Sequence, residues 1–252
     1  MNYQNIKEQL IYFLKDEVSK IGMNKVVVGI SGGLDSAIVS VLCKEAFGDN
    51  MHGVFMPSHF SSDESIVDAK ELCDKFNISY EVVEIAGMVK GYFDHIDDAT
   101  PLRIGNLSAR MRMSVLYDVS ARDNSLVIGT SNKSEILLGY GTLFGDTACA
   151  INPIGQLYKS DAFEFARYIG VTDAIIDKKP SADLWEGQSD EEDLGYTYKT
   201  MDDVLKLLID ENKTKDELLS MEIDEKLIDM LSYRVKANAF KGKQPTIAQI
   251  KF

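Results

Sequence analysis

The sequence contains little cysteine, proline and tryptophan, with three, five and one of these residues among its 252. Cys43, Cys73 and Cys149 are odd in number and far apart, which excludes a disulfide framework and a thiolate metal cluster. We therefore expect a protein of the reducing cytoplasm. Hydrophobic residues make up 45% and charged residues 27%, an ordinary globular composition that excludes a disordered or fibrous chain.

Long hydrophobic runs are absent as well. The longest have the length of a strand, as at residues 26–30, whereas a membrane span needs about 20 apolar residues. Residues 1–20 carry Lys7, Glu8, Lys15 and further charges, which interrupt any signal-peptide core. We expect no membrane partner.

Positive charge is scarce, since 27 Lys and Arg against 40 Asp and Glu give a net charge of −13, and both halves of the chain are acidic. Nucleic-acid binding normally needs a basic domain or stripe, so we expect no nucleic-acid partner. The positive segment is the tail from Leu231 onward, which holds Arg234, Lys236, Lys241, Lys243 and Lys251. Such a tail can contact a small phosphorylated ligand, but the charges alone favour a solvated face.

Short apolar runs alternate with segments of helical periodicity along the first part of the chain. We predict strands at 25–30, 51–56, 79–85 and 125–129, and helices at 1–20, 35–47, 63–76, 106–122 and 132–138. Further helices are predicted at 161–169, 199–210, 215–221 and 224–236. This alternation predicts an α/β fold with a doubly wound, Rossmann-like parallel sheet and a helical C-terminal part. We find no linker, and predict one domain over 1–252.

A polar stretch at 180–195 interrupts the helical part. It contains Gly187 and an acidic run at 190–193, and it is long for a connector. Loops of this kind are often lids over a site, so we expect it to close over bound ligands.

The most informative segment is residues 29–36, GISGGLDS, where a predicted buried strand gives way to a helix. Gly32 and Gly33 permit a sharp turn and a close approach to a ligand, and the N–H groups that begin the helix form an anion site. Ser31 and Ser36 add hydroxyl donors. Because the carboxylate of Asp35 would repel phosphates unless a cation lay between them, the segment predicts a nucleotide bound with Mg²⁺.

A plainer interpretation is a glycine-rich turn in which Asp35 or Ser36 caps the helix. The strand–loop–helix context favours the phosphate site. The chain has no GxxxxGK[ST] segment and no GxGxxG in this turn, which excludes the P-loop of kinases and GTPases and the dinucleotide fingerprint.

The string SGGLDS at 31–36 resembles the SGGxDS loop of the N-type ATP pyrophosphatases, which split ATP between its α- and β-phosphates. Three further segments resemble the ammonia-dependent NAD synthetases within that group: GNLSARMRM at 105–113, GTSNKSE at 129–135, and PSADL with GQSDE across 180–191. The resemblance covers essentially the whole chain. It implies an adenine nucleotide alpha hydrolase-like fold.

The resemblance implies ATP-dependent amidation of deamido-NAD by ammonia through an adenylated carboxylate, the last step of NAD biosynthesis. It implies an ATP site formed by Gly29, Ile30, Ser31, Gly32, Gly33, Leu34, Asp35, Ser36, Thr130, Lys159 and Ser181. It assigns Mg²⁺ to Asp35 and Glu135, and deamido-NAD to Arg110, with Lys241 as a further cation from the basic tail.

Several residues also have alternative interpretations. Glu135 can simply stabilise a helix N-terminus. Arg110 and Arg112 point in different directions from one helix, so we expect at most one at a given ligand and the other at the surface or an interface. The same helix is apolar on more than one side, which fits a core helix and fits a homodimer interface better.

Three positions differ from better-known members of the family: Leu143 replaces a Lys, Ala150 an acid and Phe240 a His. Cys43 and Cys73 fall on helix faces and are expected in the core, so no cysteine is placed to serve a glutaminase, and free ammonia is the predicted donor. Two competing functions are a tRNA-modifying enzyme, which the acidic charge disfavours, and an ATP sensor without turnover, which Asp35, Glu135 and Lys159 disfavour.

Overall fold

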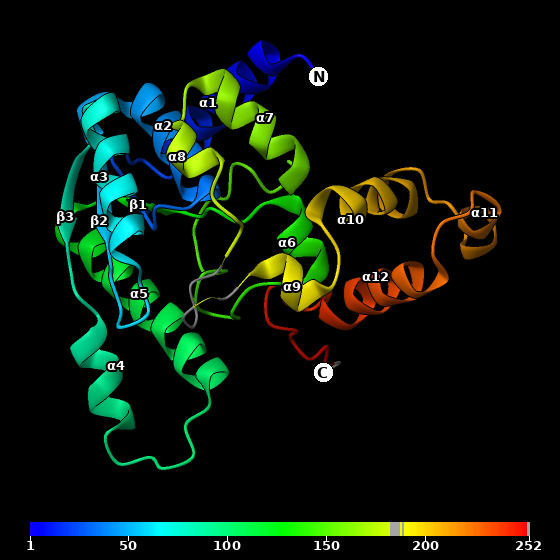
Figure 1. Cartoon of the computed structure of the whole chain (residues 1–252). Coiled ribbons are helices and arrows are strands. Elements are labelled where there is room, and N and C mark those ends of the chain that lie inside the picture. Colours follow the sequence, from blue (N-terminus) through cyan, green and yellow to red (C-terminus); the bar gives the residue numbers. More distant parts are fainter. Residues whose placement is uncertain (182–186, 188, 251–252) are drawn as a thin grey trace.

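The computed structural model describes residues 1–181, 187 and 189–250, and its centre is a parallel sheet of four strands (Figure 1). The strands are β1 (Val26–Gly29), β2 (Met51–Phe55), β3 (Ser79–Val82) and β4 (Leu126–Ile128). Their order is β3-β2-β1-β4, so β1 and β4 are neighbours although they are far apart in the sequence. The predicted parallel sheet is confirmed.

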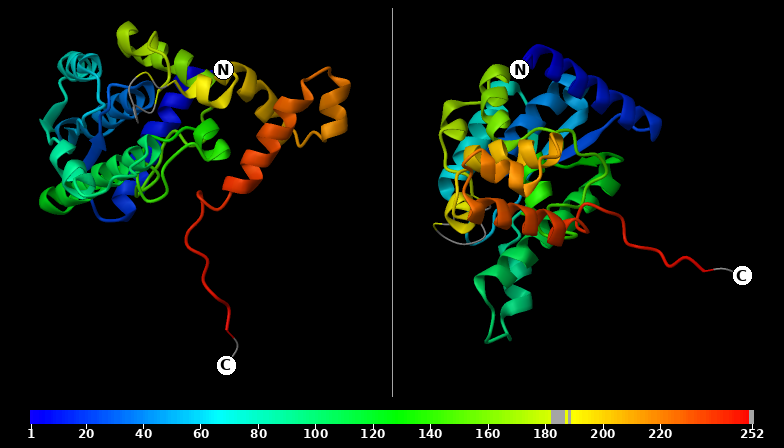
Figure 2. Two further views of the ribbon diagram at one scale, coloured as in Figure 1. Left: turned by 60° about the horizontal axis from the view of Figure 1, so that its bottom comes forward. Right: turned by 90° about the vertical axis from the view of Figure 1, so that its right-hand side faces the viewer.

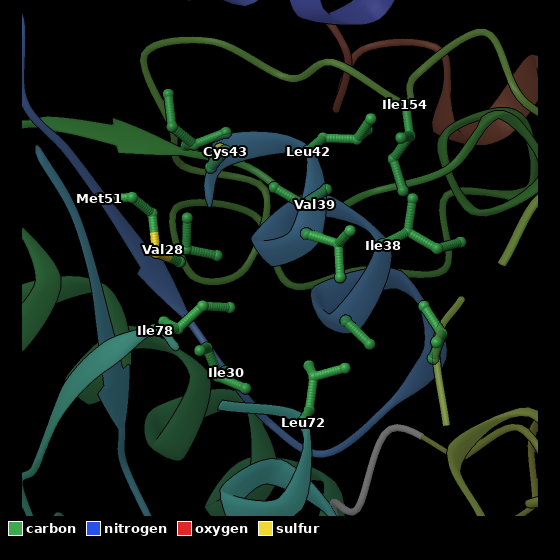
Figure 3. Packing of buried hydrophobic residues seen from close by; sticks show 14 of the residues in the cluster. Val28, Ile30, Ile38, Val39, Leu42, Cys43, Met51, Leu72, Ile78 and Ile154 are labelled. Atoms are coloured by element: carbon green, nitrogen blue, oxygen red, sulfur yellow. The ribbon is translucent and has the colours of Figure 1, made fainter. Parts of the chain in front are cut away.

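Helices cover both faces of this sheet. They are α1 (Tyr3–Lys20), α2 (Leu34–Phe47), α3 (Asp63–Phe76), α4 (Ala86–Phe93), α5 (Pro101–Asp123), α6 (Lys133–Leu138), α7 (Lys159–Ile169), α8 (Asp173–Ile176), α9 (Asp190–Leu194), α10 (Tyr198–Leu205), α11 (Lys215–Ser220) and α12 (Glu225–Asn238). Val26 and Val28 pack into the core shared with α1, α2 and α7, part of which is drawn in Figure 3. Val27 points the other way, toward Val115 and Val119 of α5. The alternation is that of a strand buried on both faces, and it confirms the doubly wound fold.

Most predicted elements are confirmed within a few residues, and the differences have local causes. The long helix α5 begins at Pro101 rather than at residue 106, because Thr100 caps it and proline fits the first helical turn. Helices α4 and α8 were not predicted. The stretch at 180–195 was expected to be a polar loop, yet α9 lies within it, with its backbone N–H at Asp190 bonded to the carbonyl of Pro180.

The C-terminal part is helical, as predicted, and has a hydrophobic cluster of its own. Helices α10 and α12 pack against α6, and α11 lies next to α12, farther from the sheet (Figure 1). Leu138 of α6, Met201 of α10 and Ile228 of α12 are buried in this cluster. A π-helical turn (Lys206–Asp210) continues α10, and the segment after α12 extends away from the body (Figure 2).

The three cysteines are free thiols. Cys43 and Cys73 are buried in the main core, which confirms their predicted place, and Cys149 is half-buried. Within the described residues, no helix combines the length and apolar character that crossing a membrane requires.

Candidate active site

The site lies where the direction of chain progression across the sheet reverses. From β1 the chain proceeds through α2 to β2 on one side, whereas β4 adds to the other side of β1. In open α/β sheets the carboxyl ends of such strands enclose the ligand crevice. A cleft of about 620 Å³ opens here. All the residues predicted to bind ATP line it: Gly29, Ile30, Ser31, Gly32, Gly33, Leu34, Asp35, Ser36, Thr130, Lys159 and Ser181.

The glycine loop between β1 and α2 lies directly on α3. Gly32 has a φ of +80°, and a Cβ added there would lie 2.2 Å from the backbone oxygen of Ser65. The Ser36 hydroxyl accepts the N–H of Ser31 at 3.2 Å and donates to the carbonyl of Gly33 at 3.0 Å. Gly33 is the N-cap of α2, and no side chain caps this helix. The capping alternative for Asp35 and Ser36 is therefore wrong.

Three charged side chains from separate elements converge beside this loop. The ammonium of Lys159 lies 2.5 Å from Oδ2 of Asp35 and 3.3 Å from Oε1 of Glu135. Asn132 Nδ2 donates to the other carboxylate oxygen of Asp35 at 3.2 Å. Lys159 is only 6% exposed, and the two carboxylates are 14% and 17% exposed. The first turns of α2, α6 and α7 thus place two acids around one cation in a largely buried part of the cleft.

Burial and charge shift the pKa values of this cluster strongly. Burial raises the pKa of Glu135 to about 8, with a further increase from the nearby charge of Asp35. For Lys159, burial favours the neutral amine, but Asp35 and Glu135 outweigh it and the pKa ends above its usual value. Lys159 therefore stays protonated, and the raised pKa of Glu135 means that its carboxyl group readily takes up a proton near neutral pH when no further cation is bound.

The donors suit Mg²⁺. Asp35 and Glu135 supply hard carboxylate oxygens that already converge on one positive charge. Across residues 1–181, 187 and 189–250, no group of three or more His, Cys, Asp or Glu side chains has metal-binding geometry. A magnesium ion here would thus take its remaining ligands from phosphate oxygens and water, as is usual at nucleotide sites.

Glu135 has a structural contact as well. It forms a capping box with Asn132, in which Glu135 N–H donates to Asn132 Oδ1 at 3.0 Å and Asn132 N–H donates to Glu135 Oε2 at 3.3 Å. The predicted place near a helix N-terminus is confirmed. The other carboxylate oxygen faces Lys159, so the metal role stays a prediction beside the capping role.

The two arginines of α5 have different surroundings, as predicted, but it is Arg112 that lines the cleft. Arg112 lines the cleft and donates to the carbonyl of Met56 at 3.0 Å and to the hydroxyl of Ser61 at 3.3 Å. The prediction that it lies at the surface or an interface is wrong, because the strand end after β2 offers it several acceptors. Arg110 is exposed and donates to the carbonyl of Leu143 at 3.3 Å. Its contact with deamido-NAD stays a prediction.

The basic tail reaches the cleft through Lys241. Its ammonium donates to the carbonyls of Gly139 at 2.7 Å and Gly141 at 2.9 Å, and it lines the cleft. Phe240 is 59% exposed. Asp146 also lines the cleft and accepts the N–H of Thr142 at 2.7 Å. The sequence pattern assigned Asp146 no function, because only the folded chain shows that it lines the cleft.

The segment after α8 is described in part. Lys178, Pro180 and Ser181 line the cleft, and Lys178 donates to Asp68 of α3 at 3.1 Å. Residues 182–186 and 188, which carry Ala182, Asp183, Leu184 and Gln188 of the family pattern, lie outside the described residues. Closure of 180–195 over the site stays a prediction.

Comparisons with known proteins identify relatives over the full length. A family model described as NAD synthase matches residues 6–245. An NH(3)-dependent NAD(+) synthetase of Wolinella succinogenes is 50% identical over 250 residues, which is 99% of this chain and 97% of that protein. The structure of an NH3-dependent NAD synthetase from Campylobacter jejuni has a TM-score of 0.85 at 42% identity and covers 99% and 100% of the two chains. An NMN synthetase from Francisella tularensis has a TM-score of 0.88 at 30% identity, with the same coverage.

Proposed function

The chain belongs to the NAD synthase family, and we infer that its cleft carries out the ATP-dependent amidation of deamido-NAD by ammonia. The products are NAD, AMP and pyrophosphate, which makes the chain a carbon–nitrogen ligase of NAD biosynthesis. The observation that carries this inference is the cluster of Lys159, Asp35 and Glu135 at the edge of the glycine loop.

The reaction has two steps. The nicotinate carboxylate attacks the α-phosphorus of ATP, which gives an adenylated intermediate and pyrophosphate. Ammonia then attacks the activated carbonyl, and AMP leaves. Positioning and charge stabilisation supply most of the catalysis in such transfers.

Different groups in the cleft bind and stabilise different parts of ATP. The backbone of residues 31–36, the Ser31 and Ser36 hydroxyls and the N-terminus of α2 hold the departing pyrophosphate. Lys159 donates to the phosphate oxygens as negative charge develops there. When bound by Asp35 and Glu135, Mg²⁺ offsets the charge of the leaving group. Thr130 and Ser181, which also line the cleft, hold the nucleotide.

Arg110 and Lys241 are our candidates for the deamido-NAD side. Lys241 is anchored on two carbonyls at the cleft, and Arg110 is exposed on α5. The α4–α5 region also presents Met88, Tyr92 and Leu102 at 46%, 58% and 57% exposure. Pairing of two copies through this surface would cover these side chains, and this supports a homodimer in which Arg110 faces a ligand near the interface.

We take residues 1–252 as one domain, because α7 and its N-cap residue connect the two hydrophobic clusters. Tyr158, the N-cap of α7, packs in the C-terminal cluster, and Phe165 of the same helix packs in the main core. The free cysteines support a place in the reducing cytoplasm.

The test is a single assay. The purified chain is incubated with ATP, MgCl₂, ammonium chloride and deamido-NAD, and NAD, AMP and pyrophosphate are quantified. Equal amounts of the three products are expected, and ADP, or no product, would refute the assignment. A parallel reaction with nicotinate mononucleotide in place of deamido-NAD tests the activity suggested by the name of the Francisella relative; we expect deamido-NAD to give the higher kcat/KM.

A further inference from the structure

Asp202 on α10 is a fully buried carboxylate that joins the C-terminal helices to the helices of the site. It has no exposed surface. Its Oδ1 accepts the hydroxyl of Ser134 at 2.6 Å, and its Oδ2 accepts the backbone N–H of Ser160 at 2.8 Å. Ser134 lies in the first turn of α6 and Ser160 in the first turn of α7. One carboxylate thus binds the N-termini of two helices.

These contacts reach the charged cluster directly. The Ser134 hydroxyl that donates to Asp202 also accepts the backbone N–H of Lys159 at 2.9 Å. Ser134 precedes Glu135, and Ser160 follows Lys159. The contacts of the Asp202 carboxylate with Ser134 and Ser160 therefore constrain the distance between the backbones of Glu135 and Lys159.

The same face of α10 contacts the other end of Lys159. Tyr198 precedes Asp202 by one helical turn, and its ring centre lies 5.5 Å from the Lys159 ammonium. Tyr198 is buried, and its hydroxyl donates to Asp190 at 3.3 Å. Helix α10 thus holds Lys159 at its ammonium through Tyr198 and at its backbone through Ser134 and Asp202.

Packing alone does not account for this carboxylate. Its neighbours on α10, Met201 and Leu205, are fully buried in the C-terminal cluster. An apolar side chain would join the two parts there without the cost of removing a charge from water. A carboxylate that accepts from two helix N-termini gives a fixed separation and orientation, which a nondirectional apolar contact does not.

We propose that Asp202 is a positioning residue for the ATP side of the reaction, which sets Lys159 and Glu135 at the spacing that Mg-ATP requires. The proposal rests on the roles that the proposed function gives to Lys159 and Glu135. It makes the C-terminal helices part of the nucleotide site, although Asp202 itself contacts no substrate.

The test compares Asp202→Asn with two matched variants by steady-state kinetics at a temperature well below unfolding. The carboxamide has one acceptor oxygen, so either Ser134 or Ser160 loses its acceptor. Asp203→Asn changes the next residue, whose carboxylate lies at the surface near Lys199. Asp210→Asn removes another link between the same parts of the fold, to Lys133 and Tyr158, without touching the Ser134–Lys159 contact.

For Asp202→Asn we expect kcat/KM for ATP to fall by about 10–100-fold, as for other residues that orient a binding group, while the KM for deamido-NAD stays within about twofold. Ser134→Ala removes the hydroxyl that connects Asp202 to the Lys159 backbone and leaves the contact of Asp202 with Ser160, and we expect the same split with a smaller loss. Both controls should keep wild-type values. If Asp202→Asn does not fold, Ser134→Ala decides the question.

The proposal is overturned if Ser134→Ala and a folded Asp202→Asn keep the wild-type kcat/KM for ATP. It is also overturned if Asp210→Asn reproduces the loss, since docking of the helices would then be sufficient. Absence of NAD formation by the wild-type chain would refute the proposed function itself. Full activity in Lys159→Met would refute the role of Lys159, whereas inactive Lys159→Met together with an unaffected Asp202→Asn would refute only the positioning role.

Discussion

The Lys159 ammonium forms a buried ion pair with Asp35 at 2.5 Å, although the two residues are 124 positions apart in the sequence. Asp35 belongs to the first turn of α2 and Lys159 to the first turn of α7. Both helices therefore point their N-termini toward one place, where their dipoles favour anions. If Asp35 held Mg²⁺, the ion would compete with Lys159 for this carboxylate, and the ammonium would become available to the phosphates.

Removing the charge of Asp35 should stop the reaction without unfolding the chain. In Asp35→Asn we expect NAD formation to fall at least about 100-fold, because the metal loses a carboxylate at the phosphates. Lys159 keeps Glu135 as a partner, so we expect the melting temperature to change by only a few degrees. Asp49→Asn, at an exposed ion pair with Lys44, is the control. Activity within twofold of wild type would contradict the metal role of Asp35.

Glu135→Gln separates the metal role of this residue from its capping role. Glutamine can preserve the capping box with Asn132, so helix α6 should remain intact. The loss of one hard anionic ligand should raise the Mg²⁺ concentration for half-maximal activity by about tenfold or more. The measurement is a Mg²⁺ titration of activity after treatment with EDTA, with circular dichroism as the control for folding. An unchanged Mg²⁺ requirement would assign Glu135 to capping alone.

The two arginines of α5 should affect different substrates. Arg112 fixes the segment after β2 through Met56 and Ser61, so Arg112→Lys, which loses the planar fork, should raise the KM for ATP. Arg110→Lys should instead raise the KM for deamido-NAD, by about tenfold at a bidentate contact. Both substitutions keep the charge and lie two residues apart, so each is the control for the other. The same KM shifts in both variants would argue against separate sites.

Signals within a short stretch of sequence predicted the features that depend on that stretch alone. The strand–glycine–helix string predicted the turn between β1 and α2, and helical periodicity placed the start of α6 within one residue. Contacts between distant segments were beyond such signals. The direction of Arg112 depends on carbonyl and hydroxyl groups more than 50 residues away, and Asp202 appears as one more polar residue of an amphipathic helix until α10 packs on α6. Hydrophobic periodicity predicts a single helix or strand, whereas the roles of Arg112 and Asp202 depend on contacts between two elements.

Gly32 should be indispensable because of space rather than conformation alone. Gly32 and Gly22 have nearly the same left-handed backbone, with φ of +80° and +77°, so alanine should strain both by about 1–2 kcal/mol. At Gly22 a Cβ meets nothing within 4 Å, whereas at Gly32 it would lie 2.2 Å from the Ser65 carbonyl oxygen. To relieve that clash, the glycine loop between β1 and α2 must move away from α3.

We therefore expect Gly22→Ala to keep its KM for ATP and lose a little stability. Gly32→Ala should lose more stability and, beyond that, at least about 100-fold in kcat/KM for ATP, as displaced anion-binding groups no longer meet the departing pyrophosphate. Thermal unfolding and ATP kinetics of the two variants, measured side by side, separate strain from displacement. If both variants lost the same stability and kept the same ATP kinetics, the close contact between the loop and Ser65 would not be needed for activity.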